Sequence, residues 1–508
     1  MMKQVALSAE LIRAQRRIEK IAAEYGLTFF PTLFEVVDYE QMNALAAYGG
    51  FPTRYPHYRF GMEYQQLSKS YEYGLHKIYE MVINNDPTYA YLLEGNMLLD
   101  QKLVMAHVYG HADFFRNNMY YALTNRKMVD TMANHSTRIR RYQERIGVEP
   151  VERFVDACLA VEELIDPGVA FHNGERKGDE KEKVGGERSD DTVPGRMPAR
   201  DYLDRYVNPP EYLEEQRKRL QKRKQESKRF PPQPERDVLG FILNHAPLEN
   251  WERDVLGIIR EESYYFLPQR QTKVMNEGWA SYWHSKIMTS KVLTDAEVID
   301  YADHHSGTVA TAPGRLNPYK LGLELFRDIE RRWNRGQFGP EWEACENMAV
   351  RANWNRELGL GMEKIFEVRR IHCDATFLDE FLTPEFCVEQ RLFVAKEDPA
   401  TRQPTFSSRQ FGEIKQALLF HFTNGGRPVI ELIDSNYANR GELLLRHRHA
   451  GGDLRWDWAA EVLQNMTLRW RRPVRLETIR KGKPVRLGHD GNDESEEEME
   501  EAAAAMTA

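Results

Sequence analysis

A charged segment with almost no apolar residues interrupts the sequence between His172 and Arg200. It consists mainly of Gly, Glu, Lys, Asp and Arg, so it offers no side chains whose burial would offset the entropy lost when the backbone is ordered. We therefore predict a disordered insert over residues 172–200. The folded structure has to be built from the two stretches on either side of it.

These two stretches are long, because the chain has 508 residues in all. A single hydrophobic core rarely organises more than about 250–300 residues, so the chain should form two or more packed units. Hydrophobic residues make up 41% of the sequence, which is enough to fill such cores, and charged residues make up 29%. This composition is typical of a globular protein.

Helical patterns dominate the sequence up to about residue 386. Residues 7–26 have apolar positions near helical spacing, with Ser8 as the N-cap and Gly26 as the terminator. Residues 39–121 are dense in Tyr, Phe, Met and Leu, with a predicted turn at residues 84–87, so several packed helices are expected there. We predict a mainly α fold whose large helical core comprises residues 1–171 and 201–386.

The pattern changes after about Cys387. Residues 428–433 and 442–447 have the composition of β-strands, and turn-forming Asp, Asn and Gly lie between them. The two strands should pair across this turn in a small sheet. We therefore predict a smaller C-terminal α+β domain over residues 387–488. Residues 489–508 are acidic and then Ala-rich, and they are expected to form a disordered tail.

Hydropathy, charge and cysteine content exclude several classes of protein. No stretch of the sequence approaches the roughly 18 uninterrupted apolar residues of a membrane helix. Residues 1–26 resemble a charged amphipathic helix more than a signal peptide. A cytoplasmic protein without membrane contact is therefore expected. The net charge of -8 gives no general attraction to nucleic acid. The four cysteines lie far apart without a CxxC pair, which favours buried thiols.

Two histidines four residues apart are the first sign of a chemical site. His107 and His111 lie within a helical pattern, which places both imidazoles on one face, one turn apart. Zinc and iron sites often use such a pair together with ligands from another helix. Chance also produces this spacing, so a pair of hydrogen-bonded core histidines is the alternative.

A second helical segment supplies further ligand types. In the segment NEGWA at residues 276–280, Glu277 lies seven residues before His284 and therefore on the same helical face. The segment is similar to the NEGFA segment in which gluzincin aminopeptidases place their third zinc ligand, after two histidines that are also four residues apart. We predict a divalent-metal site, with zinc as the expected ion, whose ligands are His107, His111 and Glu277. A buried, hydrogen-bonded polar network is the alternative.

One residue departs from the gluzincin pattern. Val108 occupies the position of the glutamate that serves as general base in those enzymes. A substitute base has to come from Glu94, Glu261 or Glu262, and Glu262 is our candidate. His284 is predicted to be a further ligand or a general acid. A catalytic site of this kind would activate water for the hydrolysis of an amide-like bond.

Six long stretches of the sequence carry a resemblance to a known family. They are RYPHYRFGMEY (54–64), YEMVINNDPTYAYLLEGN (79–96), DQKLVMAHVYGHADFFRNN (100–118), YYFLPQRQTKVMNEGWASYWHSKIM (264–288), NPYKLG (317–322) and NYANRGELLLRH (436–447). In these stretches the chain is similar to the stage V sporulation protein R (SpoVR) family. The resemblance covers nearly the whole chain apart from the charged insert and the acidic tail.

The resemblance implies a part in a sporulation or stress-response pathway. The family is named for a role in forming the spore cortex, although similar proteins occur in many bacteria that make no spores. Family genes are commonly found beside genes for a PrkA-type serine kinase and a von Willebrand-like acidic protein, which implies these two proteins as partners. Two hypotheses therefore stand: a metal-dependent hydrolase, and a non-catalytic adaptor that binds a kinase or a peptide through its C-terminal domain. Val108 favours the adaptor, and the cluster of His and Glu residues favours the enzyme.

Overall fold

The computed structural model describes residues 7–72, 80–172, 209, 212, 214, 229–309, 316–397 and 404–499. From residue 173 onward, the predicted disordered insert lies outside these residues. The chain divides into two compact units, and each is built from two separated stretches. Unit 1 comprises Met1–Glu152 with Tyr264–Gly426, and unit 2 comprises Arg153–Ser263 with Arg427–Ala508. The predicted domain boundary at residue 387 lies inside unit 1.

Unit 1 is mainly helical, which confirms the predicted fold class. Its first stretch contains α1 (Ala9–Glu24), α2 (Tyr39–Ala47), α3 (Tyr58–Glu72), α4 (Leu98–Asn117), η1 (Met119–Tyr121) and α5 (Met128–Ile146). Its second stretch contains α12 (Lys273–Ile287), η2 (Met288–Val292), η3 (Asp295–Glu297), α13 (Val298–Val309), α14 (Pro318–Arg335), α15 (Pro340–Glu343), α16 (Met348–Ala352), α17 (Gly361–Ile371), α18 (Asp374–Phe381), α19 (Pro384–Glu389), the hairpin β4 (Val394–Glu397) and β5 (Pro404–Ser408), α20 (Phe411–Phe422) and η4 (Thr423–Gly426).

The first helix follows the sequence pattern closely. The Ser8 hydroxyl accepts a hydrogen bond from the backbone N–H of Leu11 and caps the helix start. Gly26 follows the helix end with a φ of 90°, a conformation that glycine adopts without strain. The helix predicted over residues 7–26 is therefore confirmed. Among the described helices, none is both long and apolar enough to cross a bilayer.

A three-stranded sheet in unit 1 corrects the prediction for residues 39–121. Its strands β1 (Thr32–Val37), β2 (Glu80–Ile83) and β3 (Thr88–Leu93) lie in the order β1-β3-β2. Strand β3 pairs in parallel with β1 and antiparallel with β2, across the predicted turn at residues 84–87. Only helices were expected here. Strand β3 is buried on nearly all sides, and periodicity cannot distinguish a short continuous apolar run from a buried helix.

The two faces of this sheet pack against different helices. Leu92 belongs to the hydrophobic cluster that contains Tyr109 of α4. The next residue, Leu93, packs in a separate cluster with Met42 of α2. Because successive side chains of a strand point to opposite faces, α4 and α2 cover opposite sides of the sheet. The sheet thus places the start of β2 close to α4.

Helix α12 packs closely against both α4 and α14. A Cβ atom added to Gly110 of α4 would lie 2.6 Å from Ala280 Cα, and one added to Gly278 would lie 2.5 Å from Gly322 Cα of α14. No side chain fits at these points, so the helix backbones are in direct contact. Trp279 of α12 is fully buried. This packing brings the histidine face of α4 against the glutamate of α12.

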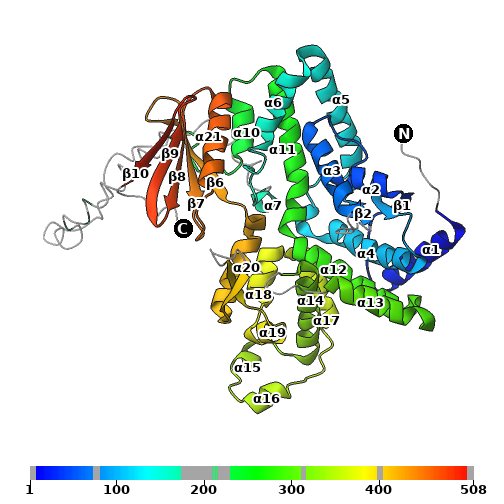
Figure 1. Cartoon of the computed structure of the whole chain (residues 1–508). Helices are drawn as coiled ribbons and strands as arrows, with labels where there is room; N and C mark the ends of the chain where they lie inside the picture. The colour runs from blue at the N-terminus through cyan, green and yellow to red at the C-terminus, as the bar shows by residue number, and fades with distance from the viewer. Residues whose placement is uncertain are drawn as a thin grey trace, which may run out of the picture. The chain divides into compact units, whose positions relative to one another are not determined.

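Unit 2 combines helices with a five-stranded sheet. The helices described in it are α6 (Val148–Leu159), α7 (Val169–His172), α10 (Val238–His245), α11 (Asn250–Gln271) and α21 (Trp456–Trp470), of which α6 and α11 extend into the chain stretches of unit 1. Its strands are β6 (Val429–Tyr437), β7 (Glu442–Arg448), β8 (Val474–Arg480), β9 (Lys483–His489) and β10 (Glu494–Glu498), in the order β10-β9-β8-β7-β6. Figure 1 shows these strands in orange to red, with α21 beside them.

The pairing within this sheet confirms one prediction and corrects another. Strands β6 and β7 form the antiparallel pair predicted from residues 428–433 and 442–447. Strand β6 also exchanges two backbone hydrogen bonds with the earlier stretch of unit 2, between Leu432 and Glu235. The acidic tail was expected to be disordered, but β10 pairs antiparallel with β9. Arginine and lysine side chains of β8 and β9 compensate its negative charges. Residues 500–508 lie outside the described part of the tail.

Candidate metal centre

Two histidines of α4 and one glutamate of α12 converge in unit 1. The Nε2 atoms of His107 and His111 each lie 3.5 Å from Oε2 of Glu277. The two imidazole centroids are 4.6 Å apart and the rings are nearly perpendicular, at 86°. These are the three side chains that the sequence analysis named as ligands of one site.

Glu80 is a fourth member of this group that the sequence analysis did not identify. It stands at the start of β2, and its Oε1 atom lies 3.6 Å from Nε2 of His107. Glu80, His107 and His111 offer ligand atoms that all lie within 4.8 Å of one another. Its only sequence signal was its place in one of the stretches similar to the SpoVR family. We call Glu80, His107, His111 and Glu277 the His/Glu cluster.

The distances within the His/Glu cluster fit a shared cation better than direct hydrogen bonds. Hydrogen bonds between N–H and O usually span about 2.7–3.2 Å, so separations of 3.5–3.6 Å are too long for good ones. Ligand atoms that lie about 2.0–2.2 Å from a tetrahedral zinc ion are about 3.3–3.6 Å apart. The three imidazole–carboxylate separations between His107 and Glu80, His107 and Glu277, and His111 and Glu277 have this spacing.

The outer nitrogen of each histidine is held by a residue of α12. Nδ1 of His111 lies 2.9 Å from Oδ1 of Asn276. Because an amide oxygen only accepts, His111 donates from Nδ1 and keeps the lone pair of Nε2 directed at Glu277. Nδ1 of His107 lies 3.3 Å from Nδ1 of His284. His284 therefore adjoins the cluster on the side away from the carboxylates.

Two carboxylate oxygens of the cluster lack ordinary partners. Oε2 of Glu80 and Oε2 of Glu277 are buried and accept no hydrogen bond of normal geometry from the residues that the structure describes. Buried polar atoms in folded proteins are almost always paired, because an unpaired one costs free energy. A cation bound between the carboxylates and the imidazoles would compensate both oxygens.

Burial and mutual contact shift the pKa values of the cluster in different directions. Burial raises the pKa of Glu80 to about 7, with the charge of Glu277 adding to this effect and His107 opposing it. Burial and the neighbouring His107 lower the pKa of His111 to about 4. Burial favours the neutral form of Glu277, but contacts with His107 and His111 outweigh it and hold its pKa below the ordinary value. Burial favours the neutral form of His107, but Glu80 and Glu277 outweigh it and raise its pKa above the ordinary value. Metals bind the neutral imidazole and the ionised carboxylate, so a bound cation would displace protons from His107 and Glu80.

Tyr319 forms another wall of this site. It is the second residue of α14, where Asn317 caps the helix. Its ring stacks on His107, with centroids 6.3 Å apart and an angle of 27° between the planes. Its hydroxyl interacts with Glu277, and burial raises the pKa of this hydroxyl. The sequence analysis did not assign Tyr319 to the site.

The three glutamates predicted as candidate bases are not members of the His/Glu cluster. Glu262 is buried in α11 and belongs to unit 2, so it is not one of the side chains that unit 1 brings together. Glu261 is exposed in the same unit. Glu94 belongs to unit 1 but is exposed just after β3. Within unit 1, Glu80 is the second carboxylate beside the histidine pair.

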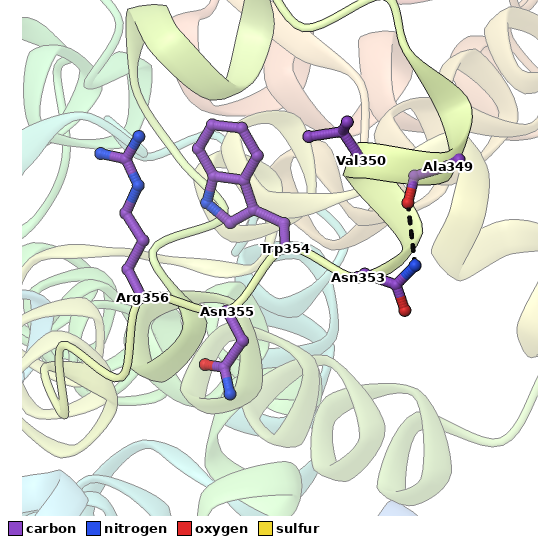
Figure 2. A pocket seen from close by; sticks show the side chains of 6 residues that line it. All are labelled: Ala349, Val350, Asn353, Trp354, Asn355 and Arg356. Atoms are coloured by element: carbon purple, nitrogen blue, oxygen red, sulfur yellow. Dashed lines mark hydrogen bonds between the residues drawn. The ribbon is translucent and has the colours of Figure 1, made fainter.

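A surface pocket in unit 1 is separate from these residues. It has a volume of about 540 Å³ and is lined by Ala349, Val350, Asn353, Trp354, Asn355 and Arg356. Figure 2 shows these side chains and the hydrogen bond that the Asn353 amide donates to the carbonyl of Ala349. The lining includes no carboxylate and no imidazole, so it offers no acid–base pair and none of the predicted site residues.

Comparison with known protein families identifies the family of this chain. The sequence model of the SpoVR-like proteins matches residues 6–427. This chain belongs to the SpoVR-like protein family. The SpoVR-like chain is also similar to the uncharacterized protein YcgB of Escherichia coli (strain K12), with 31% identity over 411 residues that cover 75% of this chain and 73% of YcgB. No solved structure matches it. The whole His/Glu cluster lies within the matched residues.

Proposed function

We propose that this SpoVR-like protein is a metal-dependent hydrolase that acts on an amide-like bond, with a divalent cation bound at the His/Glu cluster. The main support is that both ring nitrogens of each histidine have a defined neighbour. Their inner Nε2 atoms face Glu277, while Asn276 and His284 hold their outer Nδ1 atoms. Metal-binding histidines usually have their second nitrogen held in this way, because it fixes the tautomer and the ring orientation.

His107, His111 and Glu277 are the proposed ligands. Two imidazoles and one carboxylate are a ligand set of catalytic zinc sites, where they leave a fourth position open for water or substrate. Zinc is therefore the expected ion. When bound, it would polarise the substrate carbonyl and lower the pKa of a coordinated water.

Glu80 replaces Glu262 as the proposed general base. Val108, at the position of the gluzincin glutamate, is fully buried in the hydrophobic cluster of unit 1 and cannot accept a proton. Glu80 reaches the histidine pair from β2, so the carboxylate comes from the sheet rather than from the histidine helix. From this position it would accept the proton of the attacking water and return it to the leaving amine.

Asn276 and His284 are the proposed positioning residues. Asn276 fixes the Nδ1–H tautomer of His111, and His284 would accept from Nδ1 of His107 in the corresponding arrangement. This role takes the place of the predicted ligand or general-acid role of His284. It requires His284 to hold His107 without touching the substrate.

Metal analysis of protein purified without chelators tests this proposal. Wild type should contain about one zinc per chain, and His111→Gln and Glu277→Gln should lose it. Glu80→Gln should keep the metal but fail to complement a deletion strain, because only proton transfer is removed. Glu94→Gln serves as the matched control, since Glu94 is an exposed glutamate of the same unit. It should behave like wild type in both measurements.

Three results would contradict parts of this proposal. Full metal content in Glu277→Gln would show that the ligand set is wrong. Complementation by a metal-loaded Glu80→Gln variant would remove Glu80 as the base. Loss of metal from Glu80→Gln would make Glu80 a fourth ligand, and a site closed by four protein ligands is typical of a structural role rather than hydrolysis.

The family resemblance adds a cellular setting to the proposal. It implies a cytoplasmic role in sporulation or the stress response, beside a PrkA-type serine kinase and a von Willebrand-like acidic protein. These partners are predictions from the resemblance. Purification of the tagged chain from stressed cells, followed by mass spectrometry of the bound proteins, tests them. Recovery of neither protein from cells that express both would contradict a direct contact.

A further inference from the structure

Strand β10 differs from every other strand of the unit 2 sheet in its composition. All five of its residues, Glu494–Glu498, are Glu or Ser, and all five are exposed. The strand therefore buries no apolar side chain and adds nothing to the hydrophobic core. It is held by backbone pairing with β9 and by ion pairs.

The surface beneath β10 is basic. Arg480 and Lys483, at the turn between β8 and β9, pair with Glu496 at 2.7 Å and with Glu498 at 2.8 Å. The ion pairs that the structure describes for these two side chains are both made with β10. On the other face of the sheet, Glu497 lies 3.7 Å from a guanidinium nitrogen of each of two arginines, Arg475 and Arg486.

These two arginines are fixed in place by other residues of the sheet. The Arg475 side chain donates to Glu442 at 2.6 Å, and Arg486 donates to Glu477 at 2.9 Å. Both acceptors, Glu442 and Glu477, are buried. The arginines therefore keep their orientation whether or not a strand lies on the edge of β9.

The register of β10 is defined by one small residue. Ser495 lies opposite Gly488 of β9, and a Cβ atom on Gly488 would lie 2.7 Å from the Ser495 hydroxyl. The edge of β9 thus has a shallow position that accepts a small side chain. Two residues further along β10, the acidic side chain of Glu497 meets Arg475 and Arg486. Backbone pairing together with side-chain positions of this kind is how sheet edges recognise extended peptides.

We propose that the edge of β9 is a docking site for an extended acidic peptide of a partner protein, and that β10 occupies this site in the absence of the partner. Exposed ion pairs are weak and are screened by salt, so the internal strand is displaceable. Its acidic sequence shows the chemistry of the occupant: an extended segment with a small residue and glutamate or aspartate on both sides of it. This role is independent of the metal centre in unit 1.

Truncation of the chain after Gly491 tests the proposal, because it removes β10 and none of the buried core of the sheet. The probe is a fluorescein-labelled peptide with the sequence of residues 492–499, NDESEEEM. Fluorescence anisotropy should show binding to the truncated chain that is at least tenfold tighter than to the intact chain. The reason is that the tethered strand competes at an effective concentration of about 1 mM. Raising the salt from about 50 to about 500 mM should weaken the binding.

Substitutions in the truncated chain test the contacts individually. Arg480→Gln and Lys483→Gln should each weaken peptide binding severalfold. Arg455→Gln is the matched control, because Arg455 is an exposed arginine of unit 2 that pairs with Asp457. It should leave binding unchanged. The peptide with every acidic residue replaced by its amide should bind at least tenfold more weakly.

A second variant covers the case in which the truncated chain does not fold. The full-length chain with Glu496→Gln and Glu498→Gln keeps its strand but loses two ion pairs, so it should bind the peptide more tightly than wild type. Equal binding to the intact, truncated and substituted chains would overturn the proposal, as would equal binding of the amide peptide. Dimers that form only when β10 is present would also overturn it, because the occupant would then be a second copy of the chain.

Discussion

Replacement of Gly278 by alanine tests the contact of α12, the helix that carries Glu277, with α14. A Cβ atom at this position would lie 2.5 Å from Gly322 Cα and 2.8 Å from the backbone nitrogen of Leu323. Carbon atoms in van der Waals contact are usually about 3.5–4.0 Å apart. Because the opposing atoms are backbone, they cannot rotate away, and α12 and α14 have to separate by about 1 Å.

The cost follows from two opposing effects. Overpacking of a well-packed core typically costs about 1–3 kcal/mol, and a clash of backbone against Cβ belongs at the upper end of this range. The gain in helix propensity from glycine to alanine is about 1 kcal/mol. The net loss in the free energy of unfolding should be about 2 kcal/mol, which is a change of about 30-fold in the unfolding equilibrium constant.

Gly61→Ala is the matched control for this measurement. Gly61 is an exposed residue of α3 in the same unit, and a Cβ atom there would have no neighbour within 4 Å. It should raise the free energy of unfolding by up to about 1 kcal/mol. Urea unfolding followed by circular dichroism compares the two variants with wild type. Equal stabilisation by both substitutions would refute the backbone contact between α12 and α14.

Three further predictions concern other parts of unit 1 and the cysteines. Burial raises the pKa of the Asp374 carboxyl from 3.8 to about 7, so the folded chain holds this proton more strongly than the unfolded chain. Relative to Asp374→Asn, wild type should therefore be most stable below about pH 4 and should lose stability as the pH rises to about 7. Urea unfolding at several pH values measures this difference. Native protein should react with Ellman's reagent first at Cys345, which is partly exposed, because burial raises the pKa of the Cys158 thiol to about 12 and slows its reaction. A Cys345→Ser variant that still shows the fast phase of this reaction would contradict the order. His284→Ala should weaken zinc binding about 10–100-fold without abolishing it, because it removes only the support of His107; competition with a fluorescent chelator measures the affinity, and complete loss of zinc would make His284 a ligand.

The part of the candidate site that the sequence predicted consists of local relations within helices. His107 and His111 are one turn apart on α4, and helical geometry alone places them on one face. Glu277 and His284 are seven residues, about two turns, apart on α12, so they also share one face of their helix. The two faces meet because the helix backbones are in contact at glycines. The sequence indicated this meeting only through the resemblance of residues 276–280 to the NEGFA segment.

Glu80 was not predictable by the same reasoning. It reaches His107 because β2 pairs with β3 and the sheet packs on α4, and each of these relations joins residues that are distant in the sequence. Glu262 was a candidate base by its residue type. Residue type does not show to which packed unit a residue belongs, and Glu262 belongs to unit 2.

The acidic tail shows a different limit of sequence reasoning. A composition without apolar residues predicts disorder, because it offers no burial to offset the entropy of ordering. Strand β10 obtains its order from backbone pairing with β9 and from charges on Arg480 and Lys483. These partners become visible only when the turn between β8 and β9 is known.

The discontinuous architecture of unit 1 has a consequence for synthesis on the ribosome. Helix α4, which is largely buried, ends at Asn117, but its packing partner α12 begins only at Lys273. At about 5–20 residues per second, roughly 155 residues take about 8 to 30 s to add. During this time the face of α4 that later contacts Trp279 has no native partner, and the intervening residues of unit 2 emerge first. The nascent chain should therefore be a client of ribosome-associated chaperones until α12 has left the exit tunnel.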